Sequence, residues 1–436
     1  MNKKLIGLGM LLAANGAFAQ TASPSSVEIF GIIDIGVGHS QHSLSEDSNF
    51  PVNMSPVATK AGSNTGGGDT GMFNGGLSPS RIGFKGSEDL GGGLRAVFTL
   101  ETGFNSPNGV IANGVASLAN NKSTAQSTVS GDSSLAGQLF NRQANVGLAS
   151  SWGTLTLGRN YSFGYETLLA YDPMEGSQTF SPLGYSGSYG GGGFTEDFRI
   201  DNSIKYKFQS NGINVGALYK LGGQAGSTNA QSEFQFNLGY ENGPFGVSGT
   251  YSAVKDGISA ANSATAGAVN ITVADTTSYM LAASYKMDPF KLRGGYERMN
   301  FNNPSNPGLD AGITSALGYP VGAAVNVTAY NIEKTFDVYF VGLTYDVTPA
   351  FSTTVAYYDV KQNNYASAAA PCTTGTNVAT CSGKNQFYSL LGDYKLSKRT
   401  HLYAGYMYNK VDGGFANGYI GSDSNGFVGA GMKHSF

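Results

Sequence analysis

The sequence has few charged residues, two cysteines and one tryptophan, and no long apolar run follows its first twenty residues. Only 13% of its 436 residues are charged, which is low for a soluble enzyme of this size, because a soluble surface normally carries more charge. No stretch after residue 20 approaches 18 consecutive apolar residues, which excludes a membrane protein built from helices. The formal net charge of −3 is too small to indicate a nucleic-acid partner.

The chain is instead rich in glycine and aromatic residues, with 63 glycines, 25 tyrosines and 25 phenylalanines. Tyrosine has an apolar ring and a polar hydroxyl, so it suits the level at which a lipid-facing surface meets water. The composition therefore favours a protein that faces lipid across its middle and water at both ends.

The N-terminal segment MNKKLIGLGMLLAANGAFAQ has the order of a secretory signal peptide. Two lysines precede a short apolar run, and small residues precede Gln20. The run is too short to cross a bilayer as a helix. We predict that residues 1–19 are cleaved after export and that residues 20–436 form one domain. The loss of Lys3 and Lys4 would change the formal net charge from −3 to −5.

Apolar and polar residues alternate along much of the remaining chain. In SEFQFNLGY (232–240) an aromatic or aliphatic side chain occupies every second position from Phe234 to Tyr240. NSIKYKFQ (202–209) and SYMLAASYK (278–286) show the same period of two. Such alternation predicts β-strands with one buried face.

Short turns alternate with long polar loops between these strands. SNG (210–212) and ENGP (241–244) are short, whereas the long segments span 39–76, 105–138, 161–198, 301–333 and 362–385. This alternation is typical of an up-and-down antiparallel barrel in an outer membrane, with short periplasmic turns, long extracellular loops and a polar, wet lumen. A soluble sandwich would place the tyrosine-rich face in a dry core and would not explain the unequal loops.

We predict an all-β transmembrane barrel of sixteen strands. They are expected to begin near residues 27, 77, 93, 138, 152, 201, 213, 231, 245, 276, 290, 334, 350, 386, 399 and 425. Lipid cannot satisfy free backbone N–H and C=O groups, so the last strand must pair with the first, VEIFGIIDIGVG (27–38). The alternation in GAGMKHSF (429–436) continues to the last residue, as a closed seam requires.

Four blocks of the chain closely resemble the trimeric general porins of Gram-negative bacteria, the β-proteobacterial type in particular. They are SRIGFKGSEDLGGGLRAVFTLETGF (80–104), NRQANVGLASSWGTLTLGRNYS (141–162), DNSIKYKF (201–208) and LSKRTHLYAGYMYNK (396–410). The resemblance implies a homotrimeric, water-filled channel in the outer membrane, narrowed by its third extracellular loop. It also implies contacts with lipid, lipopolysaccharide and the assembly machinery, for which Phe436 would be the C-terminal signal.

The resemblance further implies a constriction in which wall arginines face carboxylates on the inward loop, an arrangement that admits small polar solutes. Arg81 and Lys85 have lumenal parity in their strand, and Arg199 shares the parity of lumenal residues in another. Arg142 matches the family's motif arginine, although its parity groups it with outward residues such as Val146. A β-bulge, or packing against a neighbouring subunit, could reconcile the two.

The acidic side of this constriction is expected in YDPMEG (171–176). The resemblance nominates Asp172 and Glu175, which would otherwise be interpreted as two solvated loop carboxylates. Glu196 and Asp197, at the far end of the same loop, are an alternative pair.

Cys372 and Cys381 are the only cysteines, and both fall in the predicted loop PCTTGTNVATC. Export to an oxidising periplasm favours a disulfide between them. A metal site is not expected, because no histidine lies near the pair and two thiols fall short of a structural zinc set. No cofactor is indicated either.

No motif for catalysis is evident, since the chain lacks G-x-S-x-G, H-E-x-x-H and Walker sequences. The favoured function is passive diffusion of ions and small hydrophilic solutes, and no enzymatic activity is expected. A channel specific for a sugar or an anion, and a sealed structural or adhesive barrel, are the alternatives. The lumenal basic residues favour anions and the net charge of −5 faintly favours cations, so the sequence leaves selectivity open.

Overall fold

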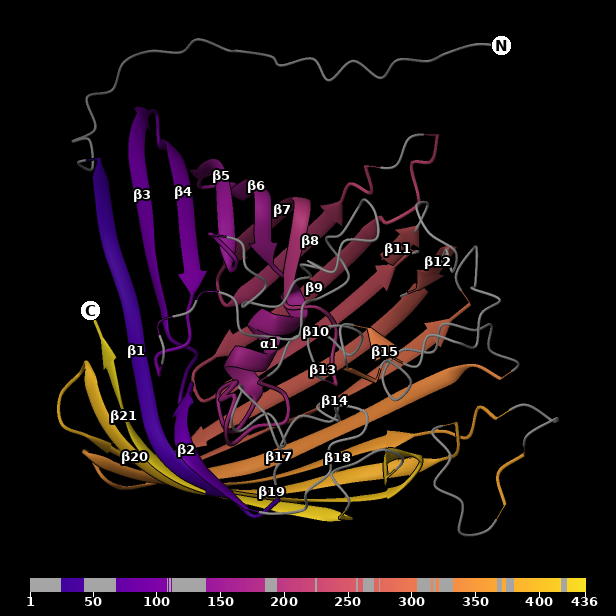
Figure 1. Cartoon of the computed structure of the whole chain (residues 1–436). Coiled ribbons are helices and arrows are strands. Elements are labelled where there is room, and N and C mark those ends of the chain that lie inside the picture. Colours follow the sequence, from indigo (N-terminus) through magenta and orange to yellow (C-terminus); the bar gives the residue numbers. More distant parts are fainter. Residues whose placement is uncertain are drawn as a thin grey trace.

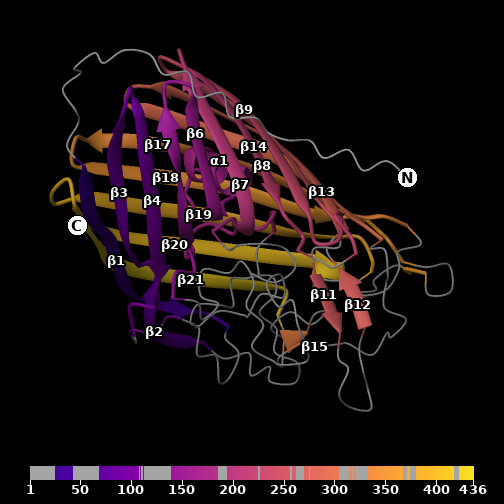
Figure 2. The same cartoon turned by 90° about the horizontal axis from the view of Figure 1, so that it is seen from above.

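The computed structural model describes residues 25–42, 68–107, 109, 111, 139–184, 194–223, 226–255, 258–261, 270–273, 275–303, 315–316, 319–320, 332–366, 371–373, 380–416 and 422–436. Its main element is one antiparallel sheet that closes on itself as a barrel (Figures 1 and 2). No helix in the described part of the chain is long and apolar enough to cross a membrane.

Sixteen strands, counted over the described residues, pair in sequence order around this barrel. They are β1 (Ser26–Ser40), β3 (Arg81–Gly91), β4 (Leu94–Gly103), β5 (Gln143–Ser150), β6 (Gly153–Tyr161), β7 (Arg199–Ser210), β8 (Ile213–Lys220), β9 (Glu233–Asn242), β10 (Phe245–Val254), β13 (Asp275–Met287), β14 (Phe290–Asn302), β17 (Lys334–Thr348), β18 (Phe351–Gln362), β19 (Gly383–Lys395), β20 (Thr400–Gly413) and β21 (Ser424–Ser435). The predicted number and order of strands are confirmed.

Shorter elements accompany the barrel strands. They are β2 (Asp69–Asn74), the helix α1 (Phe163–Tyr171), the pairs β11 (Ile258–Ala261) with β12 (Asn270–Val273) and β15 (Ser315–Ala316) with β16 (Tyr319–Pro320), and the 3₁₀ turn η2 (Gly414–Ala416). β3 and β2 pair with the same side of β1. β3 pairs with the first half of β1, and β2 pairs with the second half.

The barrel closes through β1 and β21, which pair antiparallel from Ile32 with Ser435 to Ser40 with Phe427. The last residue extends this seam, since Phe436 and Gly31 exchange two backbone hydrogen bonds of 3.1 Å. All strand edges within this ring therefore have a partner, which a lipid environment requires.

The two rims of the barrel differ. After β3, β5, β7, β9, β13, β17 and β19 the chain turns back within four residues, and all these turns lie at the end where β1 begins and β21 ends. We call this end the turn rim and the opposite end the loop rim. The alternation of short and long connections predicted from the sequence is thus present.

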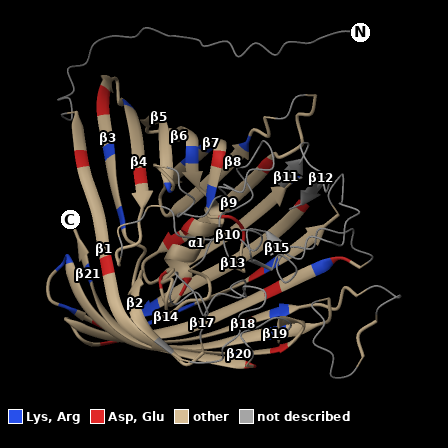
Figure 3. Cartoon of the chain, viewed as in Figure 1, with Lys and Arg blue, Asp and Glu red and all other residues tan. Residues whose placement is uncertain are grey.

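The outward positions of the strands carry large, exposed apolar side chains, as a lipid-facing surface requires. Examples are Val27, Leu281, Leu292, Val341, Val355, Leu390 and Val428. Figure 3 shows how few charged residues the strands carry between their ends. The alternation of strand residues thus places the apolar face toward lipid.

The lumenal face differs in part from the polar lining predicted by the sequence. On the strands from β13 to β21 its loop-rim half contains an apolar cluster among buried polar residues, with the buried side chains Met280, Met299, Phe301, Phe336, Phe340, Phe387, Met407 and Phe427. These residues pack against Leu168, Met174, Phe180, Leu183 and Phe194, which belong to the connection between β6 and β7. The wall is apolar here because protein, rather than water, covers it.

That connection, residues 162–198, is the third loop, and its described residues, 162–184 and 194–198, lie inside the ring of strands (Figure 1). Ser162 is the N-cap of its helix α1, and its hydroxyl accepts a hydrogen bond from the backbone N–H of Tyr165 (3.1 Å). The helix packs against β9, β10, β13 and β14, and Asp172 is its C-cap. The third loop therefore packs against the inner wall of the barrel.

Candidate functional site

Asp172 attaches the third loop to the barrel wall. Its carboxylate accepts hydrogen bonds from the Tyr358 hydroxyl and from the backbone N–H of Gly176, both 2.7 Å long. Burial raises the pKa of the Asp172 carboxyl by more than these hydrogen bonds lower it. The sequence placed Asp172 on the acidic side of a constriction, and the structure differs, because a side chain with no exposed surface cannot face permeating solutes.

Glu175 is the carboxylate that the third loop presents to the lumen. Its side chain is 63% exposed, and its Oε1 lies 2.6 Å from Nη2 of Arg293. Glu175 has a left-handed backbone with φ of 56°, which is strained for a residue other than glycine and costs of order 1 kcal/mol or more. The Asp172–Gly176 hydrogen bond stabilises this bend. The strained turn directs the Glu175 carboxylate toward the wall.

Arg293, on β14, is a site residue that the sequence did not single out. Besides contacting Glu175, it donates a hydrogen bond from Nη1 to the carbonyl of Pro173 (3.3 Å). The signal was present in KLRGGYERM (291–299), where Lys291 and Arg293 share the parity opposite the outward Leu292. Parity alone, however, does not show that the loop lies over this strand.

Arg142 lies inside the barrel and is fully buried. Its Nε donates to Glu101 (2.8 Å) and to the hydroxyl of Tyr161 (3.0 Å), and its Nη2 donates to the hydroxyl of Tyr165 (3.1 Å). The conflict with strand parity disappears because β5 begins only at Gln143, so Arg142 precedes the regular alternation. Its role here is to connect the wall carboxylate Glu101 with the third loop.

The other three predicted basic residues have different surroundings. Arg81 lies 3.6 Å from Glu101 with 17% of its side chain exposed, and Lys85 pairs with Glu28 at 3.2 Å with 51% exposed. Arg199 is buried, with its guanidinium 4.8 Å from the ring centre of Tyr165. Of the predicted basic wall, only Arg81 and Lys85 therefore present appreciable side-chain surface.

The alternation of β7 that predicted a lumenal Arg199 is interrupted between Ser203 and Arg199. The register between β6 and β7 shifts after the pair Gly158–Ser203, and Asn202 has a positive φ of 53°. Arg199 consequently pairs with Tyr161 of β6, and its guanidinium lies over the rings of Tyr161 and of Tyr165 in the third loop. A local irregularity of this kind is not visible in a pattern of period two.

Two further contacts hold the third loop. Glu166 of α1 forms ion pairs with Lys205 (2.9 Å) and Lys207 (3.0 Å) of β7. Desolvation raises the pKa of the Glu166 carboxyl, and the two ammonium groups lower it by more, so that it stays below its usual value. Glu196, one of the alternative acids, is buried instead; burial and the nearby Glu297 raise its pKa well above the usual range.

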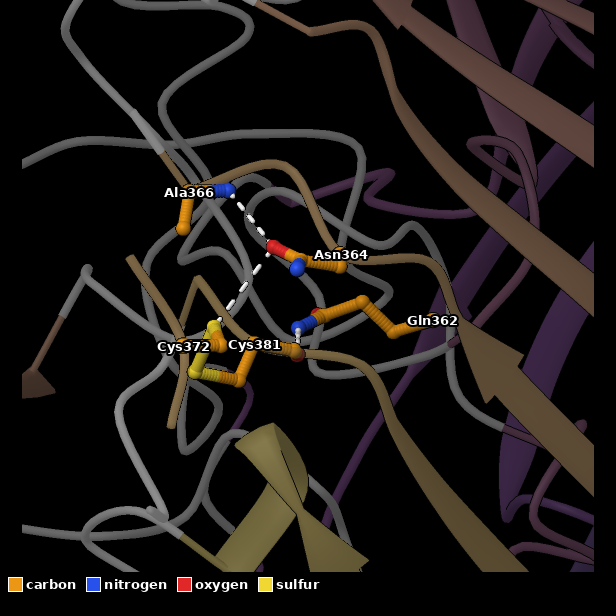
Figure 4. The surroundings of a disulfide bond; sticks show 5 residues. All are labelled: Gln362, Asn364, Ala366, Cys372 and Cys381. Atoms are coloured by element: carbon orange, nitrogen blue, oxygen red, sulfur yellow. Dashed lines mark hydrogen bonds between the residues drawn. A yellow bond between two sulfur atoms is a disulfide. The ribbon is translucent and has the colours of Figure 1, made fainter. Parts of the chain in front are cut away.

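Cys372 and Cys381 form a disulfide beside the loop rim (Figure 4). Their α-carbons are 5.6 Å apart, and the side-chain amide of Gln362, at the end of β18, donates to the carbonyl of Cys381 (2.8 Å). Within the described residues, no group of three or more histidine, cysteine, aspartate or glutamate side chains is placed to hold a metal ion. The disulfide thus ties a loop to the end of a barrel strand.

Comparison with known proteins identifies the family. A family model described as Gram-negative porin matches residues 7–414. The chain belongs to the Gram-negative porin family. Like its relatives, this porin is an outer-membrane protein that forms a channel for passive diffusion of ions and small hydrophilic solutes.

Two curated relatives extend over most of this porin. It is 29% identical to an outer membrane porin protein of Bordetella pertussis, with the whole of both chains covered. It is 28% identical to outer membrane porin protein 32 of Delftia acidovorans, over 69% of this chain and 70% of that one. These relatives are channels rather than enzymes.

Solved structures share the fold. The anion-selective porin from Comamonas acidovorans superposes with a TM-score of 0.62 at 21% identity, covering 94% of this porin and all of that chain. OmpT of Vibrio cholerae, in a structure described as a trimer form, gives a TM-score of 0.56 at 14% identity and covers 95% of this porin. At these identities the likeness concerns the barrel architecture.

Proposed function

We propose that this porin is a homotrimeric diffusion channel with a preference for anions, and that its constriction lies between the third loop and the barrel wall. The observation that carries this proposal is the contact between Glu175 and Arg293. The exposed carboxylate of the third loop is matched by an arginine, and the lysines Lys291 and Lys433 also act on it electrostatically. Cations thus outnumber the loop carboxylate at this level.

We assign Arg81 and Lys85 to the basic wall of the constriction, because both keep exposed surface on lumenal positions. Arg142 and Arg199 are buried next to this wall and stabilise it. Arg142 donates a hydrogen bond to Glu101, and Arg199 lies over the rings of Tyr161 and Tyr165. Charged groups on both sides of a narrow section favour polar solutes over apolar ones, and an excess of cations attracts anions. The solved anion-selective porin from Comamonas acidovorans supports this preference.

The assembly of the channel follows the same proposal. The trimer form of OmpT supports a homotrimer for this chain. The predicted signal peptide, residues 1–19, lies outside the described residues, and its cleavage would leave residues 20–436 as the barrel. Phe436, at the seam with Gly31, is proposed as the C-terminal signal for the assembly machinery. Lipid and lipopolysaccharide would then contact the outward faces of the barrel.

Single-channel current in a planar bilayer, measured across a salt gradient, tests this proposal. Current steps arriving in threes would support the open trimer, and a reversal potential toward that of the anion would support its selectivity. The variants Arg81→Glu and Glu175→Lys should move the reversal potential in opposite directions, whereas Asp172→Asn, at a buried position, should leave it unchanged. Folded, heat-modifiable protein that carries no current would favour a sealed barrel, for which the apolar packing of the third loop would be the structural basis.

A further inference from the structure

The lumen contains a second charged region, on the turn-rim side of the third loop. It is a cavity of about 250 Å³ between residues 173–175 of the loop and the wall strands β13, β14 and β17–β21. We call it the loop-tip cavity. It is distinct from the cluster of Arg81, Glu101 and Arg142, none of which lines it.

Cationic side chains predominate in the loop-tip cavity. Its charged lining consists of Lys286, Lys291, Arg293, Lys395 and Lys433, the carboxylates Glu175, Asp346 and Asp393, and the imidazole of His401. With the histidine neutral, five positive charges face three negative charges. The cavity therefore has an excess of two positive charges.

Three of the four lysines in this lining have no carboxylate partner. Arg293 pairs with Glu175 at 2.6 Å, and Lys286 pairs with Asp288, outside the lining, at 3.2 Å. The neutral ring of His401 hydrogen-bonds Asp393 through Nδ1 (3.0 Å). Across the described residues, Lys291, Lys395 and Lys433 form no ion pair. Their ammonium groups are therefore available to a ligand.

Strand register explains why these groups converge. Lys395 is paired with His401 across β19 and β20, and His401 with Lys433 across β20 and β21, so the three side chains lie side by side on one lumenal row. Lys291 is paired with Lys286 across β13 and β14. Like charges placed in neighbouring positions destabilise a sheet slightly, and a bound anion would offset the repulsion between Lys286 and Lys291.

Neutral donors complete the lining. The hydroxyls of Thr344 and Thr354 lie 3.0 Å apart, and Ser352 is their neighbour in the cavity wall. The Nε of Arg293 is buried and has no hydrogen-bond partner among the described residues. Ammonium, guanidinium and hydroxyl groups are the donors that bind carboxylate and phosphate oxygens.

We propose that the loop-tip cavity is a transit-binding site for small oxyanions, in which Lys291, Lys395 and Lys433 supply the attraction and the hydroxyls orient the ligand. This inference rests on the proposed diffusion function and deepens it, because the cavity contains the Glu175–Arg293 contact of the constriction and extends from it along the wall strands. Such a site must bind weakly, because conduction requires that the ligand also leave. Chloride, with no oxygen atoms to accept directed hydrogen bonds, would bind there more weakly than phosphate or acetate.

The test compares chloride current in single channels of the full-length trimer with and without inorganic phosphate, at constant ionic strength. We expect phosphate to reduce chloride current along a saturating curve. Because one exposed charge contributes about a twofold change in affinity, the triple variant Lys291→Gln, Lys395→Gln, Lys433→Gln should raise the half-effective phosphate concentration roughly tenfold. A parallel series with acetate distinguishes phosphate from carboxylate as the preferred oxyanion.

Lys255→Gln is the control, since Lys255 is an exposed lysine that pairs with Asp275 outside this cavity. It should leave the phosphate curve unchanged. Broadening of the phosphorus-31 resonance of phosphate by the detergent-solubilised trimer, lost in the triple variant, gives a readout independent of current. An absence of chloride current would overturn the proposed function itself. Normal chloride current with a phosphate effect that is linear, or equal in the triple variant, would overturn the site alone.

Discussion

Phe436 and Gly31 form the last contact of the barrel seam. Their backbones exchange two hydrogen bonds, and the ring of Phe436 lies over Gly31 so closely that a Cβ built there would be 2.4 Å from the ring and 2.7 Å from the carbonyl oxygen of Arg81. Glycine is therefore required at position 31, because the terminal aromatic ring and the neighbouring strand occupy the space of a side chain.

The variant Gly31→Val should weaken this seam while leaving the C-terminal residue in place. Overpacking of a tight site typically costs about 1–3 kcal/mol, which we expect to appear as a lower urea midpoint for unfolding of the barrel in detergent. Gly249→Ala is the control, since the nearest atom to a Cβ at position 249 is 3.8 Å away. Equal midpoints for the two variants would contradict this account of the seam.

The variant Tyr358→Phe should loosen the third loop. It removes the hydroxyl that donates to the buried carboxyl of Asp172, and an unsatisfied buried acceptor costs about 1–3 kcal/mol. We expect noisier single-channel current and faster proteolysis within residues 162–184. Tyr357→Phe serves as the control, because Tyr357 is partly exposed and its hydroxyl accepts a hydrogen bond from Gln386 rather than contacting the third loop. If both variants behaved like the wild type, the Asp172–Tyr358 contact would not hold the loop.

The variant Glu101→Gln should strongly destabilise the barrel. Arg142 is fully buried and Glu101 nearly so, and removal of one partner of a buried ion pair costs about 3–5 kcal/mol. Thermal unfolding followed by electrophoretic mobility measures the effect. Glu28→Gln breaks an ion pair in which both side chains are more than half exposed, so a change below about 1 kcal/mol is expected there. Comparable losses in the two variants would show that Arg142 does not depend on Glu101.

Selectivity should change with pH through Glu175. Desolvation raises the pKa of this carboxyl and Arg293 lowers it by more, so the pKa in the folded protein is below the usual 4.5. The attraction between Glu175 and Arg293 is therefore fully present above pH 4.5 and is lost as the pH falls through this lowered pKa. The reversal potential in a salt gradient should stay constant down to about pH 4.5 and then shift toward anions. Glu175→Gln should show the low-pH value already at pH 7.

Reduction of the disulfide should lower stability at the loop rim. Cross-linking of positions nine residues apart restricts the unfolded chain and contributes about 2–3 kcal/mol. Treatment with a reductant should decrease the unfolding midpoint of the wild type, and the double variant Cys372→Ser, Cys381→Ser should have the lower midpoint with or without reductant. A wild-type midpoint that does not respond to reduction would contradict this role.

The sequence alone predicted the number and order of the barrel strands. Each strand of the barrel faces lipid on one side, so apolar and polar residues alternate along its sequence. Each turn is marked by local residues such as SNG at 210–212. The predicted starts near residues 213, 245 and 290 coincide with those of β8, β10 and β14. These features could be predicted because their causes are local.

Parts of the site were beyond sequence reasoning because they depend on where a strand begins and on a register break. Arg142 points inward since β5 begins only one residue later, and Arg199 leaves its expected parity because the register shifts beside Asn202. A bulge changes the direction of every preceding side chain, and no residue type announces it unambiguously.

The positions of the other site residues depend on contacts between residues that are far apart in the sequence. Asp172 is removed from the lumen by Tyr358, 186 positions away, and Glu175 meets Arg293, 118 positions away. The sequence by itself determined that this chain closes as a sixteen-stranded barrel with a lipid-facing exterior, because the membrane imposes a requirement on every strand. Only the tertiary structure decided which charges face the lumen, because that depends on where the third loop packs against a wall built from the other half of the chain.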